Sequence, residues 1–311
     1  MRQRMELHNP APTLADPVFV ARDEIFADRP ERASSQRFTG LWVSGTLAGL
    51  QRRAVAIVGT RAPSDGGRAR ARDLGTALGR SGICIVSGLA LGIDGAAHSG
   101  ALAGGGVTIG VLGGGHRHFF PRRNRALAEA MLAAGGAVLS PYAPDEPARP
   151  PQFLQRNAVV AALVDAVVVV EAAERSGALN TAGWAGALGV DVLAMPGDVD
   201  RPKAAGCNAL IRDGATLVRD AEDVLGALGI AAGTRFPLAP AACGSGARPA
   251  PAEGDALADR LLELLAGAPR ELDALSEAAG APAGTVLATL VRLEIDGAVE
   301  RRDAATFAVL R

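Results

Sequence analysis

Short runs of apolar residues recur through the middle of the chain, and a loop rich in glycine or polar residues follows most of them. The stretches between these runs carry Ala and Leu at helical spacing. Strands buried on both faces need continuous apolar runs, and strands that alternate with helices form parallel sheets. The pattern therefore predicts an α/β fold with a doubly wound, mainly parallel sheet and right-handed crossovers. The expected strands cover residues 54–58, 83–86, 107–112, 137–139, 166–170, 192–195 and 216–218.

The same pattern divides the chain into four segments. Residues 1–40 show no sustained periodicity, and we expect a poorly ordered lead-in there. The sheet domain covers residues 41–229, and residues 230–254 are rich in Ala, Gly and Pro, as in a flexible linker. Residues 255–311 contain three amphipathic stretches followed by two short apolar runs, which predicts a small winged-helix-like domain.

The composition is that of a globular protein, with 49% hydrophobic and 21% charged residues, and this excludes a mainly disordered chain. Three cysteines without C-x-x-C spacing predict neither a disulfide framework nor a metal site. No apolar window approaches the roughly 18 residues of a membrane span, and the first residues lack the apolar stretch of a secretory signal. We therefore expect a cytoplasmic protein that makes no contact with a membrane.

Charge is distributed unevenly along the chain. The formal net charge is −1, yet residues 51–160 hold 13 arginines and six acidic side chains, a local charge of +7. This excess favours an anionic partner for that segment. Residues 251–311 carry a charge of −5, so phosphate repulsion predicts only weak duplex binding by the winged-helix-like domain.

Polar and basic residues gather in the loops after the expected strands. Ligands of open α/β sheets bind beyond the carboxyl ends of the strands, where helix N-termini present free N–H groups. The loop at residues 113–125 is the most basic, with four Arg interleaved with two His and two Phe, a combination that suits single-stranded nucleic acid. The candidate binding residues of all these loops are Gly59, Thr60, Arg61, Ser87, Gly88, Phe119, Phe120, Arg122, Arg125, Phe153, Arg156, Asn157, Ser176, Gly177 and Thr181.

Several of these features have simpler structural interpretations that the residues alone leave open. Both phenylalanines of the basic loop could be core residues, and Arg68, Arg70 and Arg72 could lie on a solvated helix face. Asp94 could cap the next helix, and His98 is more typical of a structural histidine than of a general base. No loop carries a dinucleotide G-x-G-x-x-G or a Walker sequence, so no cofactor is expected.

Eight ordered motifs lie between residues 58 and 215: VGTR (58–61), SGLALGID (87–94), FPRRNRAL (120–127), FLQRN (153–157), VVVVEA (167–172), SGALNTA (176–182), MPG (195–197) and GCNALIRDGA (206–215). Together they resemble the family of DNA-processing protein A, DprA, also called Smf. The resemblance covers roughly residues 40–229, and residues 255–311 resemble the winged-helix-like domain of many members. This chain has Leu154-Gln155 where many members carry Pro at the second position.

The resemblance implies an extended Rossmann fold that binds single-stranded DNA in a basic pocket, without catalysis. It further implies a homodimer that loads the recombinase RecA onto incoming DNA in natural transformation. In the family, the Arg of the VGTR-type loop and a basic residue after the Pro-x-x-Asn motif contact the strand, and these correspond to Arg61 and Arg125. Arg156 and Asn157 correspond to the family's Arg-Asn motif. For the dimer surface, Val224 and Leu228 are candidates by their apolar character.

An enzyme on a related fold is the alternative: a nucleotide phosphoribohydrolase of the LOG type. That class needs a P-G-G-x-G-T-x-x-E loop whose Glu acts on the ribosyl bond. The corresponding loop here, SGALNTAGWA, has Ala185 near the place of the acid and contains no carboxylate. The sequence therefore favours the binding protein over the enzyme.

Overall fold

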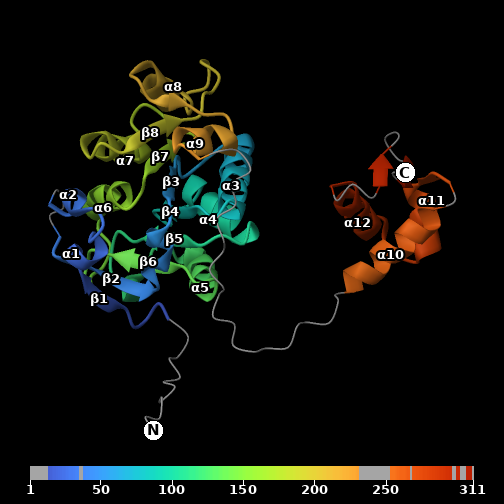
Figure 1. Cartoon of the computed structure of the whole chain (residues 1–311), viewed down its shortest axis with the longest axis horizontal. Coiled ribbons are helices and arrows are strands. Elements are labelled where there is room, and N and C mark those ends of the chain that lie inside the picture. Colours follow the sequence, from blue (N-terminus) through green and yellow to red (C-terminus); the bar gives the residue numbers. More distant parts are fainter. Residues whose placement is uncertain are drawn as a thin grey trace, which may run out of the picture. The chain divides into compact units, whose positions relative to one another are not determined.

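A computed structural model of the chain describes residues 13–34, 38–230, 253–266, 268–295, 299–301 and 306–309. The chain divides into two compact units, Met1–Ala241 and Ala242–Arg311, which are described separately below (Figure 1).

The first unit is built on a nine-stranded sheet with the order β1-β2-β6-β5-β4-β3-β7-β8-β9. Strands β3 to β9 are parallel to one another, whereas β2 pairs antiparallel with β6 and β1 pairs antiparallel with β2. The mainly parallel, doubly wound sheet predicted from the apolar runs is confirmed. Its strands are β1 (Val18–Ala21), β2 (Gly40–Gly45), β3 (Ala54–Val58), β4 (Cys84–Ser87), β5 (Thr108–Val111), β6 (Ala137–Ser140), β7 (Ala166–Val169), β8 (Asp191–Ala194) and β9 (Thr216–Leu217).

Helices cover both faces of this sheet. Along β3, Val55 and Ile57 pack into the core beneath α3, α4 and α9, whereas Ala56 and Val58 pack into the core beneath α6 and α7. The helices are α1 (Arg22–Ile25), α2 (Pro30–Ser34), α3 (Asp65–Arg80), α4 (Ile93–Ala103), α5 (Arg125–Ala133), α6 (Pro150–Ala162), α7 (Gly177–Ala187), α8 (Ala205–Arg212) and α9 (Ala221–Ala227), with 3-10 turns η1 (Leu47–Gln51), η2 (His116–His118) and η3 (Arg122–Asn124).

The strand order reverses between β3 and β7. From β3 the chain builds β4, β5 and β6 on one side, and it then returns to place β7, β8 and β9 on the other side. The loops that follow β3 and β7 therefore diverge at the carboxyl edge of the sheet. Such a reversal leaves the crevice in which open α/β sheets bind their ligands.

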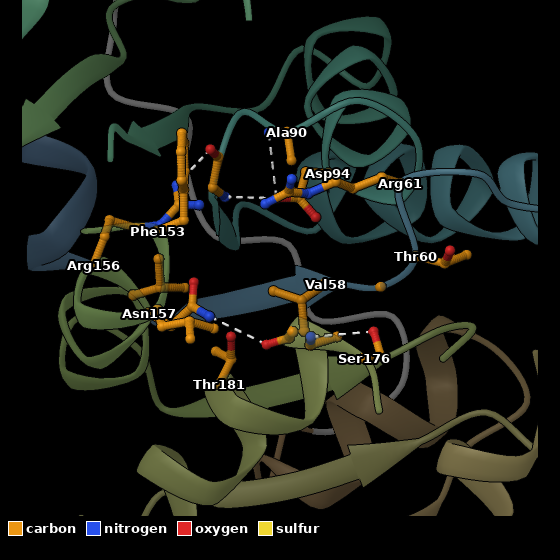
Figure 2. A pocket seen from close by; sticks show the side chains of 16 residues that line it. Val58, Thr60, Arg61, Ala90, Asp94, Phe153, Arg156, Asn157, Ser176 and Thr181 are labelled. Carbon is orange, nitrogen blue, oxygen red and sulfur yellow. Dashed lines mark hydrogen bonds between the residues drawn. The ribbon is translucent and has the colours of Figure 1, made fainter. Parts of the chain in front are cut away.

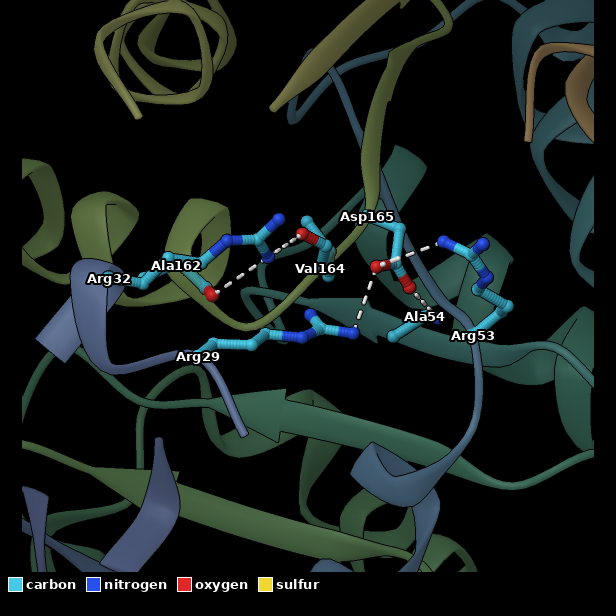
Figure 3. Close-up of polar contacts among 7 residues, drawn as sticks. All are labelled: Arg29, Arg32, Arg53, Ala54, Ala162, Val164 and Asp165. Carbon is cyan, nitrogen blue, oxygen red and sulfur yellow. Dashed lines mark hydrogen bonds and ion pairs between the residues drawn. The ribbon is translucent and has the colours of Figure 1, made fainter. Parts of the chain in front are cut away.

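The segment before the sheet domain is ordered in part, contrary to the prediction of a poorly ordered lead-in over residues 1–40. Residues 18–34 form β1, α1 and α2, and an ion-pair cluster fastens them to the sheet (Figure 3). Asp165 lies at its centre: its carboxylate accepts from Arg29 at 2.9 Å and from the backbone N–H of Ala54 at 2.9 Å, and it lies 3.6 Å from Arg53. The pairing of β1 with β2 and the burial of Phe26 and Ala33 add to these contacts. The charged contacts are long-range, and hydrophobic periodicity gave no sign of them.

Arg32 strengthens the same attachment, because its guanidinium donates to the carbonyls of Ala162 and Val164 at the end of α6 (Figure 3). The predicted dimer-surface residues Val224 and Leu228 are buried in the core beneath α9. The prediction that they form a surface is therefore wrong, because the apolar side of this short helix already faces the sheet.

The second unit has its own core, in which Leu261, Leu275, Leu290 and Phe307 are buried. Helices α10, α11 and α12 accompany a small antiparallel sheet with the order β10-β12-β11. The predicted linker at residues 230–254 falls almost entirely outside the described residues. The elements of the second unit are α10 (Glu253–Leu265), β10 (Arg270–Glu271), α11 (Leu272–Ala279), α12 (Ala283–Ile295), β11 (Val299–Arg301) and β12 (Thr306–Val309). Across both units, no described helix has the length and apolar character that a membrane span requires.

Candidate nucleic-acid interface

A pocket of about 290 Å³ lies at the carboxyl edge of the sheet, where the strand order reverses (Figure 2). The loops after β3, β4 and β7 form its walls together with residues of α6 and the N-terminal part of α7. The fold thus brings together residues that are far apart in the sequence. The predicted binding residues that line the pocket are Gly59, Thr60, Arg61, Gly88, Phe153, Arg156, Asn157, Ser176, Gly177 and Thr181.

Arg156 forms part of the pocket floor and is only 4% exposed. Its guanidinium donates to the carbonyls of Gly88 and Val111, which lie at the ends of β4 and β5. Only a glycine fits beneath it, since a Cβ at Gly88 would lie 2.5 Å from Nη1 of Arg156. Arg156 therefore fixes the loop after β4 and places a positive charge beneath the pocket, while its Nε has no hydrogen-bond partner in the described structure.

Asp94 is the acidic neighbour of that charge. Its Oδ2 accepts from the backbone N–H groups of Gly88 at 3.1 Å and Ala90 at 3.4 Å, so the carboxylate closes the loop after β4. The sequence suggested a helix cap, but the N-cap of α4 is Gly92 and Asp94 lies in the first turn. Burial raises the pKa of Asp94, and the charge of Arg156 opposes that shift.

The guanidinium of Arg156 stays protonated near neutral pH despite its burial. Burial lowers the pKa of Arg156 to about 10, Asp94 opposes this shift, and the charge of Arg61 adds to it. Two positive groups therefore bound one side of the pocket, and only one carboxylate faces them. An anionic ligand at this pocket would be attracted by the remaining positive charge.

Arg61 and two phenylalanines form a platform at the pocket mouth. The guanidinium carbon of Arg61 lies 5.4 Å from the ring centroid of Phe153, within the range of a cation–π contact. The Phe153 ring is 5.9 Å from that of Phe120, which is 54% exposed. A guanidinium beside accessible rings can hold a phosphate and stack an adjacent base.

Phe119 and Ser87 do not belong to this surface. Phe119 is 5% exposed and packs with Leu112 and Met131 under α5, so the prediction that it is available to a ligand is wrong. Adjacent residues in this turn point in opposite directions, and Phe120 takes the exposed position. Ser87 is fully buried, and its hydroxyl donates to the carbonyl of Ile57 at 2.7 Å, which joins β4 to β3.

Arg122 and Arg125 are exposed beside the pocket rather than in its lining. Arg125 forms an ion pair with Glu129 one turn later on α5, with Nε and Oε1 3.1 Å apart. The residue between them that sequence reasoning missed is Asn124, whose amide donates to the carbonyls of Leu89 and Ala90, both at 2.9 Å. Asn124 thus fastens the basic loop to the loop after β4.

Glu171, which follows β7, holds the loop that carries Arg61. Its carboxylate accepts from the backbone N–H of Ser64 at 3.0 Å and from the Ser64 hydroxyl at 3.1 Å. Its carbonyl accepts from the N–H of Thr60 at 2.7 Å. A Cβ at Gly67 would lie 1.9 Å from Oε2 of Glu171, so the carboxylate occupies the N-terminus of α3. The VVVVEA motif contained this residue, but nothing in the sequence assigned it a role.

The buried histidines are structural. Nδ1 of His98 lies 2.7 Å from the Thr108 hydroxyl, and burial lowers the pKa of His98 to about 3, which keeps the ring neutral. His116 lies 3.0 Å from the carbonyl of Val138 through Nε2, and burial lowers its pKa as well. Both rings are buried, and neither lines the pocket.

An α/β unit with a basic pocket at its switch point and a separate winged-helix-like unit define the class of this protein. The chain matches the DNA recombination-mediator protein A family over residues 19–229 and the DprA winged helix domain over residues 245–304. It belongs to the DNA recombination-mediator protein A family, and the resemblance drawn from the sequence motifs is confirmed.

Relatives and solved structures agree with this assignment. Protein Smf of Escherichia coli is 38% identical over 273 residues, 86% of this chain and 71% of the relative. A DprA protein of Mycobacterium tuberculosis is 46% identical over 188 residues, 60% of this chain; the chain thus spans about half, 48%, of that relative's length.

Two solved structures are similar in fold to this chain. DprA from Streptococcus pneumoniae has a TM-score of 0.57 and 40% identity, over 60% of this chain and 66% of that one. DNA processing protein A from Helicobacter pylori has a TM-score of 0.56 and 29% identity, over 61% of this chain and 86% of that one. The latter structure is described as giving insight into the single-stranded DNA binding mode of that protein.

Proposed function

We propose that this protein binds single-stranded DNA at the switch-point pocket and loads RecA recombinase onto that strand during natural transformation. One observation carries the binding part: Arg61 lies over the Phe153 ring at the mouth of a pocket whose floor holds the charge of Arg156. This arrangement offers phosphate neutralisation and base stacking side by side, without any contact that reads a particular base. RecA loading and a homodimer rest on family membership and are part of the proposal.

The proposal assigns no catalysis to the pocket. Among the described pocket residues, Ser176 accepts from the N–H of Ala178 and Thr60 accepts from the N–H of Ala62, and neither hydroxyl is hydrogen-bonded to a histidine. The phosphoribohydrolase alternative would need a carboxylate on α7. Ala185, near the place of that acid, carries none and is fully buried. These contacts favour a binding surface over a hydrolytic site.

Fluorescence anisotropy of labelled oligo-dT, titrated with the intact protein over a range of salt concentrations, tests the binding part. If about three phosphates are neutralised, the slope of log affinity against log salt is near −2, at about −0.7 per phosphate. Arg61→Ala then flattens this slope by about 0.7. The matched control is Arg212→Ala, which removes an exposed charge on α8 away from the pocket.

Two outcomes would contradict the proposal. If the intact protein does not bind oligo-dT at low salt, or binds it no better than the annealed duplex, the pocket is not a single-strand site. If Arg61→Ala and Arg212→Ala leave the same slope, the strand lies elsewhere. A strand-exchange assay with RecA and DNA coated by a single-strand binding protein tests the loading part, with Arg61→Ala expected to lose the stimulation.

A further inference from the structure

A second, larger cleft lies next to the switch-point pocket. It has a volume of about 760 Å³, within the range of ligand-binding clefts, and it lies between α3, α4 and η3. Four arginines line it, together with two aspartates, which leaves two positive charges in excess. The charged lining consists of Arg61, Arg68, Arg72, Arg123, Asp65 and Asp73.

The arginines of this cleft lack charge partners. Arg68 and Arg72 are one turn apart on α3, so they lie on the same face of the helix, and both are exposed. In the described parts of the chain, neither they nor Arg123 has a carboxylate within 4 Å. Arg125, by contrast, is neutralised by Glu129. Unpaired guanidinium groups around a concave surface fit the phosphates of an anionic ligand.

The two hollows meet at Arg61, which lines both. The loop after β4 also serves both, because Gly88 and Ala90 face the pocket whereas Leu91 and Gly92 face the cleft. Gly92 has φ +87°, and a Cβ there would lie 2.4 Å from the carbonyl oxygen of Thr60, so this loop packs directly on the loop that carries Arg61. These two packed loops form a ridge between the two hollows.

We propose that the second cleft binds the backbone phosphates of the DNA strand next to the segment held in the switch-point pocket. This inference rests on the proposed function. A strand longer than the pocket crosses the ridge at Arg61, and Arg68, Arg72 and Arg123 neutralise the phosphates beyond it. The solvated helix face suggested by the sequence thus becomes a second part of the binding surface.

The test compares two double variants of the same helix across oligo-dT strands from about 4 to about 30 nucleotides. Arg68→Ala/Arg72→Ala removes two charges from the cleft. Arg70→Ala/Arg80→Ala removes two exposed charges of α3 that lie outside it. Circular dichroism confirms that both variants are folded, and anisotropy at several salt concentrations gives affinities and slopes.

The cleft variant should bind the shortest strands like the wild type and the long strands more weakly. Loss of two phosphate contacts flattens the salt slope by about 1.4, which is about 25-fold weaker binding at roughly 0.1 M salt if the affinities converge near 1 M. The control variant should keep the wild-type slope on long strands. Arg68→Lys/Arg72→Lys should restore most of the slope, because lysine retains the charge.

The alternative outcomes separate the two proposals. If the wild type binds long strands and both double variants lose affinity equally, the loss comes from the lower total positive charge of the protein. The second cleft is then not a binding site. A loss that is the same at every strand length also overturns the cleft proposal, while the proposed function stands. If the wild type binds no strand of any length, both proposals fail.

Discussion

Replacing Gly88 by alanine forces a methyl group against the guanidinium of Arg156. The added Cβ would lie 2.5 Å from Nη1 and 2.6 Å from Cζ and Nη2. The guanidinium cannot move aside freely, because it is buried and donates to the carbonyls of Gly88 and Val111. The backbone of Gly88 cannot move freely either, because Asp94 accepts a hydrogen bond from its N–H.

The substitution must therefore break at least one of these contacts. A hydrogen bond to a charged group contributes about 1.5–3 kcal/mol to stability, and the two carbonyl bonds of Arg156 are of this kind. We expect Gly88→Ala to lower the free energy of unfolding by about 3 kcal/mol. The matched control is Gly177→Ala, which changes another glycine of the same pocket, at the start of α7, where a Cβ would meet nothing within 4 Å.

Urea-induced unfolding followed by circular dichroism measures both variants against the wild type. Gly177→Ala should change the free energy of unfolding by less than about 1 kcal/mol, and in the stabilising direction, because alanine loses less backbone entropy on folding. If the two alanine variants unfold at the same urea concentration, the packing of Arg156 against Gly88 does not hold the pocket floor in place, and the reasoning is refuted.

Three further predictions concern pH, the N-terminal anchor and stacking. The pKa of His98 is about 3 in the folded state and about 6.5 when unfolded, so its contribution to stability is present above pH 6.5 and decreases by about 1.4 kcal/mol per pH unit below it. His98→Gln should flatten the fall of the unfolding free energy between pH 6.5 and 5, and an unchanged slope would show that His98 takes up a proton as readily in the folded as in the unfolded protein. Asp165→Ala removes the acceptor of the Ala54 N–H and the partner of the partly buried Arg29, and should lower stability by about 1–3 kcal/mol. It should also make residues 18–34 sensitive to limited proteolysis, and equal protease resistance would contradict the anchoring role. Phe153→Ala should weaken oligo-dT binding by about 1–3 kcal/mol in anisotropy titrations. Phe119→Leu, in the core, should lower stability and leave that affinity intact. A loss of affinity in Phe119→Leu but not in Phe153→Ala would contradict the assignment of the exposed platform.

The sheet could be predicted because its information is local. Strands buried on both faces must be continuously apolar, so β3 and β7 are visible as AVAIV and AVVVV in the sequence. The segment at residues 18–34 could not be predicted in this way. Part of its attachment is the ion pair of Arg29 with Asp165, which are 136 residues apart. A pair of charged residues at that separation leaves no periodic pattern in the sequence.

The location of the site was predictable, but the direction of its side chains was not. Parallel strands gather their carboxyl ends at one edge, so the loops that follow β3 and β7 had to lie at the reversal point. Whether Phe119 or Phe120 faces outward depends on the turn between η2 and η3, which periodicity does not describe. The ion pair of Arg125 with Glu129 was visible as an i,i+4 spacing and would have identified Arg125 as partly neutralised.

The contacts of Glu171 with Ser64 and Thr60 favour the proposed polymer ligand over a nucleotide cofactor. In dinucleotide-binding sheets, the first helix N-terminus binds a pyrophosphate with its free N–H groups. Here the N–H and hydroxyl of Ser64 and the N–H of Thr60 are already bonded to Glu171, and Gly67 leaves room for its carboxylate. The N-terminus of α3 is thus occupied, and Arg61 in the pocket lining supplies a guanidinium group for an anionic ligand instead. Such groups can follow a phosphate backbone of variable path, as the proposed binding of single-stranded DNA requires.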